Sequence, residues 1–343
     1  MADGNMITVE QLVKVYPGGT QAVASIDFTV SEGEFFGFLG PNGAGKSTTI
    51  KILSTLLKKT SGRVSVAGHD IDKAAMEVRR SIGVAMQEVG LDDLTKGRDF
   101  LVMQGLLHGQ SRKEAQRRAS ELLELVELEY AAARKVGTYS GGMRRRIDLI
   151  SALMHSPSLL FLDEPTTGLD PQSRLAIWDH LQNLNRQGIT IFLTTQMMEE
   201  ADRLCGRLAI IDQGQLVAEG TPAALKDQQG GDVINITIQA STDEERGRHL
   251  AEALAIVGGR SYVSAANATS DGLSITVQDG GAAAPDLLQL LSEKKIAVSN
   301  LAVASPTLDD VFLKYTGRQI RSEESSGDEM AAAMRPWMGL SRR

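Results

Sequence analysis

A glycine-rich segment that begins at Gly40 has the composition and spacing of a phosphate-binding loop. The sequence GPNGAGKST follows an apolar run at residues 35–39 and precedes a helical pattern. Small residues let backbone N–H groups approach phosphate oxygens, and the start of the following helix adds a positive dipole. The residues that we expect to line a nucleotide phosphate are Gly40, Pro41, Asn42, Gly43, Ala44, Gly45, Lys46, Ser47 and Thr48.

Within this loop, Lys46 and Ser47 have the side chains that phosphate chemistry requires. We expect Lys46 to reach the β- and γ-phosphates of a bound nucleotide and Ser47 to hold Mg²⁺. A glycine-rich turn that binds nothing is the alternative in a chain with 34 glycines. The placement between a strand pattern and a helix pattern favours the phosphate site.

Two adjacent carboxylates, Asp163 and Glu164, follow the apolar run LLFL. Successive strand residues point to opposite faces, so we expect the two side chains to have different roles. Asp163 is predicted to contact Mg²⁺, and Glu164 to polarise the water that attacks the γ-phosphate. Taken alone, such a pair is most often a solvated strand end, and the phosphate loop upstream is what favours catalysis.

The elements that must position these residues alternate between strand and helix patterns, which predicts an α/β domain. Residues 92–135 lack a strand pattern and are expected to form a helical insert, and residues 212–215 a hairpin turn. The expected strands cover residues 7–15, 22–30, 34–39, 63–66, 82–85, 159–162, 189–193 and 207–211, and the expected helices residues 46–57, 112–128, 142–155, 171–186 and 197–204.

A second pattern follows the polar segment at residues 227–232. Its strand–helix–strand–strand–helix–strand order is the ferredoxin-like arrangement, closed by a helix at residues 307–315. The expected strands are 233–239, 261–265, 273–277 and 296–304, and the expected helices 244–257 and 284–294. We divide the chain into an ATP-binding domain (1–225, with a helical subdomain at about 92–155), an α+β domain with a regulatory or dimerisation role (226–317) and a flexible tail (318–343).

Composition excludes several classes of protein. A net charge of −7 over 343 residues argues against nucleic-acid binding through phosphates. A single cysteine, Cys205, rules out an intrachain disulfide and fits a reducing compartment, where it is expected to be apolar filler. Neither a signal-peptide pattern nor an apolar run of about 20 residues occurs, so we expect a cytoplasmic protein.

A third motif, YSGGM at residues 139–143, lies between the phosphate loop and the Asp-Glu pair. This order of motifs resembles that of ATP-binding cassette (ABC) ATPases. The resemblance implies a P-loop cassette, a mixed sheet core with a helical subdomain, that works as a homodimer. It also implies that Ser140, Gly141 and Gly142 contact the ATP held by the opposite subunit, which places two ATP molecules between two chains.

The same resemblance assigns expected roles to residues whose side chains would otherwise indicate little. Tyr16 stands where an aromatic ring stacks on adenine. Gln87 stands where a glutamine touches Mg²⁺ and responds to a membrane permease. Asp170 lies in a loop that contacts the other subunit of the dimer.

Two departures from the family pattern narrow the resemblance. Gln196 occupies the position of a switch histidine; it cannot exchange a proton near neutral pH but can donate a hydrogen bond to the γ-phosphate, so hydrolysis should be slowed and not abolished. Tyr139 and Met143 replace the commoner Leu and Gln. These departures, with SPTLDDVF at residues 305–312, are similar to the drug-resistance branch typified by daunorubicin exporter ATPases.

This branch implies export of a hydrophobic drug or natural product through a separate permease, with the ATPase at the cytoplasmic face of the membrane. An importer ATPase and a non-transport ABC ATPase are the alternatives. Translation factors of the family carry two cassettes in one chain and repair ATPases carry a long coiled coil, and neither pattern occurs here. Residues 144–146, RRR, are expected to form a solvated or interface face, in which one arginine could lie near phosphate, and not a nucleic-acid site.

Overall fold

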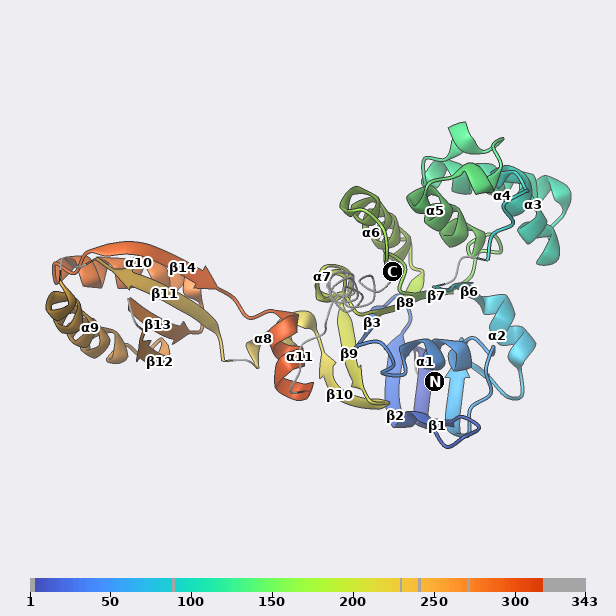
Figure 1. Ribbon diagram of the computed structural model, residues 1–343. Helices are drawn as coiled ribbons and strands as arrows, with labels where there is room; N and C mark the ends of the chain where they lie inside the picture. The colour runs from blue at the N-terminus through green and yellow to red at the C-terminus, as the bar shows by residue number, and fades with distance from the viewer. Residues whose placement is uncertain (1–3, 88–89, 229, 240–241, 270–271, 317–343) are drawn as a thin grey trace, which may run out of the picture. The chain divides into compact units, whose positions relative to one another are not determined.

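The computed structural model describes residues 4–87, 90–228, 230–239, 242–269 and 272–316 (Figure 1). The chain forms two compact units, one over Met1–Gly220 and one over Thr221–Gly317. The predicted boundary after residue 225 falls inside helix α8 (Pro222–Asp227), which belongs to the second unit. The predicted tail at 318–343 lies outside the described residues.

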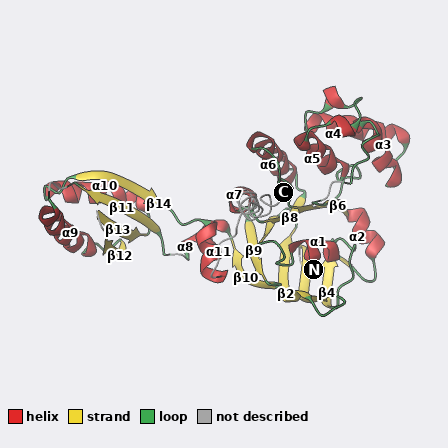
Figure 2. Ribbon diagram, in the orientation of Figure 1, coloured by secondary structure: helices red, strands yellow, loops and turns green. Residues whose placement is uncertain are grey.

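Two sheets form the framework of the first unit (Figure 2). One is antiparallel with order β2-β1-β4-β5, and the other has order β10-β9-β3-β8-β7-β6, in which β10 alone pairs antiparallel. The strands are β1 (Asn5–Val15), β2 (Gln21–Ser31), β3 (Phe35–Leu39), β4 (Ser61–Val66), β5 (His69–Asp70), β6 (Ile82–Ala85), β7 (Leu159–Asp163), β8 (Thr190–Thr195), β9 (Arg207–Asp212) and β10 (Gln215–Gly220).

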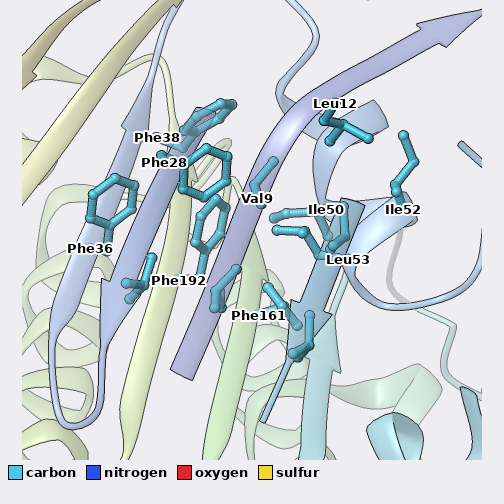
Figure 3. Packing of buried hydrophobic residues seen from close by; sticks show 14 of the residues in the cluster. Val9, Leu12, Phe28, Phe36, Phe38, Ile50, Ile52, Leu53, Phe161 and Phe192 are labelled. Carbon is cyan, nitrogen blue, oxygen red and sulfur yellow. The ribbon is translucent and has the colours of Figure 1, made fainter. Parts of the chain in front are cut away.

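The parallel strands bring their carboxyl ends to one edge, where ligands bind in sheets of this kind. The strands β3, β7 and β8 are buried along their whole length, which explains their continuous apolar sequences. Helix α1 (Lys46–Leu53) follows β3 and contacts strands of both sheets. Figure 3 shows the resulting core, in which Phe28, Phe38 and Phe192 lie near Ile50 of α1. Helix α1 is therefore anchored in the core by Ile50, Ile52 and Leu53, and this packing positions its first residue, Lys46.

Several helices differ in extent from the prediction. Helix α1 ends at Leu53 and not at residue 57, because the Ser54 hydroxyl bonds back to the carbonyl of Ile50 and Thr55 takes a left-handed φ of 63°. Helix α4 (Arg112–Leu125) is shorter than predicted, as is α5 (Gly141–Ser151), whereas α6 (Pro171–Arg186) has the predicted bounds. Helix α2 (Ala75–Ser81) was missing from the prediction, and α7 spans Met198–Leu204. Helix α3 (Gly97–Leu107) lies within the predicted helical insert, for which no separate bounds were predicted.

The expected helical insert is confirmed. Helices α3 and α4 pack together and α5 contacts both, while short 3₁₀ turns at Glu129–Ala131 and Val136–Thr138 connect α4 to α5. Cys205 is buried directly after α7, as expected of apolar filler. Within the described part of the chain, the helices are all too short or too polar to span a bilayer.

The second unit has the predicted ferredoxin-like topology. Its sheet has the order β12-β13-β11-β14 with antiparallel pairing throughout, and α9 and α10 contribute to an apolar core with the sheet. Helix α11 packs on α8, where Lys314 Nζ donates to the Gln228 carbonyl at 2.7 Å. The elements are β11 (Asp232–Ile238), α9 (Asp243–Gly258), β12 (Val263–Ala268), β13 (Gly272–Val277), α10 (Gly280–Glu293), β14 (Val298–Ala304) and α11 (Leu308–Thr316).

Candidate active site

The glycine-rich loop connects the end of β3 to the start of α1, at the carboxyl edge of the parallel strands. Gly45 has φ 110°, and a Cβ there would lie 2.4 Å from the carbonyl oxygen of Ala22. A Cβ on Gly40 would lie 2.3 Å from the carbonyl oxygen of Ile211. The loop therefore needs glycine at both positions to pack this closely against neighbouring backbone.

Lys46 extends across the loop, and only 4% of the residue is exposed. Its ammonium donates to the carbonyl oxygens of Gly40 at 2.7 Å and Pro41 at 3.0 Å, and lies 3.2 Å from Glu164 Oε1. Burial lowers the pKa of Lys46, against the opposing effect of the Glu164 charge. A phosphate bound in the loop would give this buried cation a strong anionic partner.

Asp163 ends β7 beside the start of α1 and is buried. Its Oδ1 accepts hydrogen bonds from Ser47 Oγ at 3.1 Å and from Thr194 Oγ1 at 2.5 Å. Among the described residues, His, Cys, Asp and Glu form no group of three that could hold a metal ion. A hydroxyl beside one carboxylate nevertheless fits Mg²⁺, which binds to one or two carboxylates together with substrate phosphates and water.

Glu164 leaves the strand with a left-handed φ of 47°. Its Oε2 accepts a hydrogen bond from Thr167 Oγ1 at 3.3 Å, and its Oε1 faces Lys46. The strand alternation that predicted opposite directions for Asp163 and Glu164 does not hold, because the backbone turns at Glu164. Both carboxylates contact the first turn of α1.

A cavity of about 250 Å³ lies over the loop. Gln87, predicted near Mg²⁺, lines this cavity. Tyr16, predicted at the adenine, has its Oη 3.3 Å from Thr48 Oγ1. Gln196 follows β8, whose last residue, Thr195, accepts a hydrogen bond from the Gly40 N–H at 3.2 Å. The cavity is lined by Ala22, Asn42, Gly43, Gly45, Lys46, Ser47, Thr48, Gln87 and Glu164.

The YSGGM motif lies at the start of α5, with Ser140 as the N-cap that accepts a hydrogen bond from the Met143 N–H. Ser140 and Gly141 are exposed, and both stand outside the lining of the cavity. A Cβ on Gly142 would lie 2.5 Å from Ser173 Oγ of α6, so glycine allows α5 and α6 to approach. Asp170 caps α6 by accepting from the Ser173 N–H at 2.9 Å. The chain therefore presents this motif away from its own phosphate loop.

Tyr139 and Met143, the residues at which the YSGGM motif departs from the family pattern, both have buried side chains. Tyr139 donates its hydroxyl to the Ala131 carbonyl at 2.8 Å, and it lies so close to Gly97 that a Cβ there would be 2.2 Å from Tyr139 Oη. Met143 is 8% exposed and contacts the hydroxyl of Tyr130. Tyr139 and Met143 therefore pack the helical subdomain.

The prediction for the three consecutive arginines is wrong for Arg145, which is 5% exposed. Arg144 forms an ion pair with Asp93, and Arg146 donates to the Val126 carbonyl at 2.8 Å. Arg145 instead donates to backbone carbonyls beside Glu164 and Gln87. The sequence prediction did not distinguish Arg145 from its neighbours as the residue beside the site, although Asp148, three positions later, could have indicated an ion pair on α5.

Comparisons with known proteins agree with this geometry. A model of the ABC transporter family matches residues 23–167, and a model of the DrrA1-3-like ATP-binding protein C-terminal domain matches residues 220–316. The daunorubicin/doxorubicin resistance ATP-binding protein DrrA of Streptomyces peucetius is 41% identical over 330 residues, which cover 95% of this chain and 98% of the relative. The chain belongs to the ABC transporter ATP-binding proteins. It is accordingly an ATP-binding, ATP-hydrolysing subunit of an ABC transporter.

A further relative of this ABC subunit matches most of the chain, and solved structures match about two thirds of it. The linearmycin resistance ATP-binding protein LnrL of Bacillus subtilis is 38% identical over 321 residues, covering 92% of this chain and 100% of the relative. Among solved structures, cbiO1 from Clostridium perfringens matches with a TM-score of 0.62 and 27% identity, over 66% of this chain and 92% of that one. A dimeric ATP-binding cassette bound to ADP and phosphate matches with a TM-score of 0.59 and 28% identity, over 63% and 98% of the two chains.

The ionisation of Asp148 should make the stability of the ABC subunit depend on pH. Burial raises its pKa from 3.8 to about 6, although Arg145 lies 3.1 Å away and opposes the rise. Because the pKa of Asp148 is higher in the folded chain than in the unfolded chain, the folded state loses stability as the pH rises from 3.8 through about 6 and Asp148 ionises. Between about pH 4.5 and 7 this group should lower the free energy of unfolding by ~2 kcal/mol.

We therefore expect Asp148→Asn to show a shallower fall in unfolding free energy between these pH values than the unsubstituted chain. Urea titrations followed by far-ultraviolet circular dichroism at several pH values measure the difference. Identical pH slopes for the two proteins would show that Asp148 ionises in the fold as freely as in the unfolded chain.

Proposed function

We propose that this subunit hydrolyses MgATP in a head-to-tail homodimer and thereby drives export of a hydrophobic drug or natural product through a separate permease. The observation that carries the proposal is the division of the site. Lys46, Ser47 and Glu164 line one cavity, and Asp163 accepts a hydrogen bond from Ser47 beside it, whereas Ser140 at the start of α5 lies outside the cavity and is exposed. A second chain, oriented head to tail, would supply the missing helix start.

The role of each side chain follows from phosphoryl transfer, which depends on positioning and charge stabilisation. Lys46 would hold the β- and γ-phosphates, and Ser47, Asp163 and Gln87 would hold Mg²⁺. Bound Mg²⁺ would neutralise charge on the phosphates. Glu164 would orient and accept a proton from the attacking water, since its carboxylate lies at the cavity beside Lys46.

The remaining roles concern recognition. Tyr16 would stack on adenine, next to Thr48 at the loop. Gln196 would donate a hydrogen bond to a γ-phosphate oxygen from the end of β8. Ser140, Gly141 and Gly142 of the partner subunit would donate to the same γ-phosphate, and Asp170 would contact the opposite subunit.

The direction and cargo of transport are supported by the relatives' names, which include resistance proteins for daunorubicin, doxorubicin and linearmycin. The subunit would then work at the cytoplasmic face of the membrane, bound to its permease. We infer that the second unit stabilises the homodimer or regulates the permease. A chain ending at Gly220 that dimerises and transports as well as the full chain would contradict this role.

Affinity purification of the tagged chain from membranes of its native host tests the proposed function. We expect an integral membrane permease to co-purify, and both proteins in inside-out vesicles to accumulate daunorubicin when ATP is added. Vesicles with Lys46→Ala should show no accumulation. Purification without a membrane partner, or ATP-dependent transport in the opposite direction, would contradict the proposal.

A further inference from the structure

Arg145 makes an unusual set of contacts one turn after the start of α5. Its guanidinium donates to three backbone carbonyls, those of Met86 at 2.6 Å, Pro165 at 2.7 Å and Asp163 at 3.1 Å. Its remaining contact is the carboxylate of Asp148 at 3.1 Å. The side chain therefore joins α5 to the segments that follow β6 and β7.

Two of these carbonyls flank Glu164. The left-handed backbone of Glu164 is unfavourable for a non-glycine residue, so neighbouring contacts must stabilise it. The Glu164 N–H donates to the Thr194 carbonyl at 3.0 Å, which holds the preceding side of the turn. Arg145 holds the carbonyls of Asp163 and Pro165 on either side of Glu164. Arg145 therefore contacts the backbone on both sides of the turn that directs the Glu164 carboxylate to Lys46.

The third carbonyl, that of Met86, precedes Gln87 in the cavity lining. A guanidinium has several N–H donors in a rigid plane and can serve all three carbonyls at once, which a lysine ammonium on a flexible stem cannot do with the same geometry. A buried charge of this kind destabilises the fold unless it is paired and hydrogen-bonded. Asp148 supplies the pairing, and the carbonyls supply the hydrogen bonds.

We propose that Arg145 is a positioning residue for ATP hydrolysis, which holds Glu164 and the peptide before Gln87 in the arrangement that hydrolysis needs. Because Arg145 also belongs to α5, the side chain connects the helix that contacts the partner's nucleotide to the chain's own hydrolytic carboxylate. This inference rests on the proposed role of Glu164.

The first test separates nucleotide binding from turnover. Arg145→Met and Arg145→Lys should lower kcat about 10- to 100-fold, because a displaced Glu164 no longer orients water, while KM and the affinity for a fluorescent ATP analogue change by less than about 3-fold. Arg145→Lys keeps the charge beside Asp148 and so provides a variant that folds. Losses of affinity as large as the losses of kcat in both variants would overturn the inference.

Arg207 provides a matched control. Its guanidinium also has several partners, including Glu34 Oε1 at 2.7 Å and the Thr29 carbonyl at 2.6 Å. It begins β9 opposite Phe36, at the end of the sheet away from the phosphate loop. Arg207→Met should lower thermal stability and leave kcat unchanged at a temperature where the protein is folded. An equal loss of kcat in Arg207→Met would show that Arg145 acts only through stability.

The second test combines substitutions. If Arg145 acts through Glu164, then Arg145→Met should add little further loss to the single-turnover hydrolysis rate of Glu164→Gln, because the group that it positions is already disabled. The inference would be overturned if Arg145→Met lowered the hydrolysis rate of Glu164→Gln by a further factor of about 10 to 100, as it is expected to do in the otherwise unsubstituted chain. If Glu164→Gln hydrolysed ATP at the wild-type rate, Glu164 would not be the base, and the proposed function itself would be refuted. If Glu164→Gln were slow but Arg145→Met were fully active, only the role of Arg145 would be refuted.

Discussion

The substitution Glu164→Gln is expected to lower steady-state ATP hydrolysis by about 10²–10⁴-fold, which is the usual contribution of a general base. Glutamine preserves the size of the side chain but cannot accept a proton from water. Binding of ATP should persist, because Lys46 and the backbone of the phosphate loop remain. Phosphate release at saturating MgATP measures the rate, and a fluorescent ATP analogue measures binding.

Glu121→Gln is the control for this experiment. Glu121 forms ion pairs with Arg117 and Arg118 on the surface of α4, and its substitution should leave hydrolysis unchanged. If Glu164→Gln turned over ATP as fast as this control does, the carboxylate beside Lys46 would not be the base.

The second large effect is expected at Lys46, where Lys46→Ala should weaken ATP binding by about 10²–10³-fold. Truncating one partner of a buried charge pair commonly costs about 2–5 kcal/mol, and here it also leaves Glu164 without its ion-pair partner. Titration of the fluorescent ATP analogue measures the change in affinity.

Lys51→Ala provides the comparison, since Lys51 lies in the last turn of the same helix and is exposed. We expect its affinity for ATP to match that of the unsubstituted chain. An undiminished affinity in Lys46→Ala would mean that the phosphates bind elsewhere than in the glycine-rich loop.

The sequence was sufficient to predict the α/β framework, the ferredoxin-like second unit and the loop between β3 and α1. These features depend on local patterns. The apolar runs of β3 and β7 and the glycine spacing after β3 can each be read within a dozen residues, and α6 begins at Pro171 after the N-cap Asp170, a common helix start. The pattern of residues alone therefore specified where the phosphate loop would lie.

The parts that could not be predicted depend on contacts between distant segments. The sequence has three consecutive arginines at 144–146, and their type does not indicate which of them is buried. Arg145 is buried because α5 packs against the ends of β6 and β7. The backbone turn at Glu164 is stabilised by Thr194 and Arg145, which are both far from it in sequence. Strand periodicity could therefore not predict that the two carboxylates face the same loop.

The dependence of dimerisation on nucleotide is the most direct test of a site shared between two chains. Light scattering of purified Glu164→Gln with MgATP should give the mass of a dimer, and the same protein with ADP or without nucleotide should give the mass of a monomer. A monomer under every one of these conditions, and also in the presence of the permease, would contradict the head-to-tail arrangement of phosphate loop and Ser140 helix.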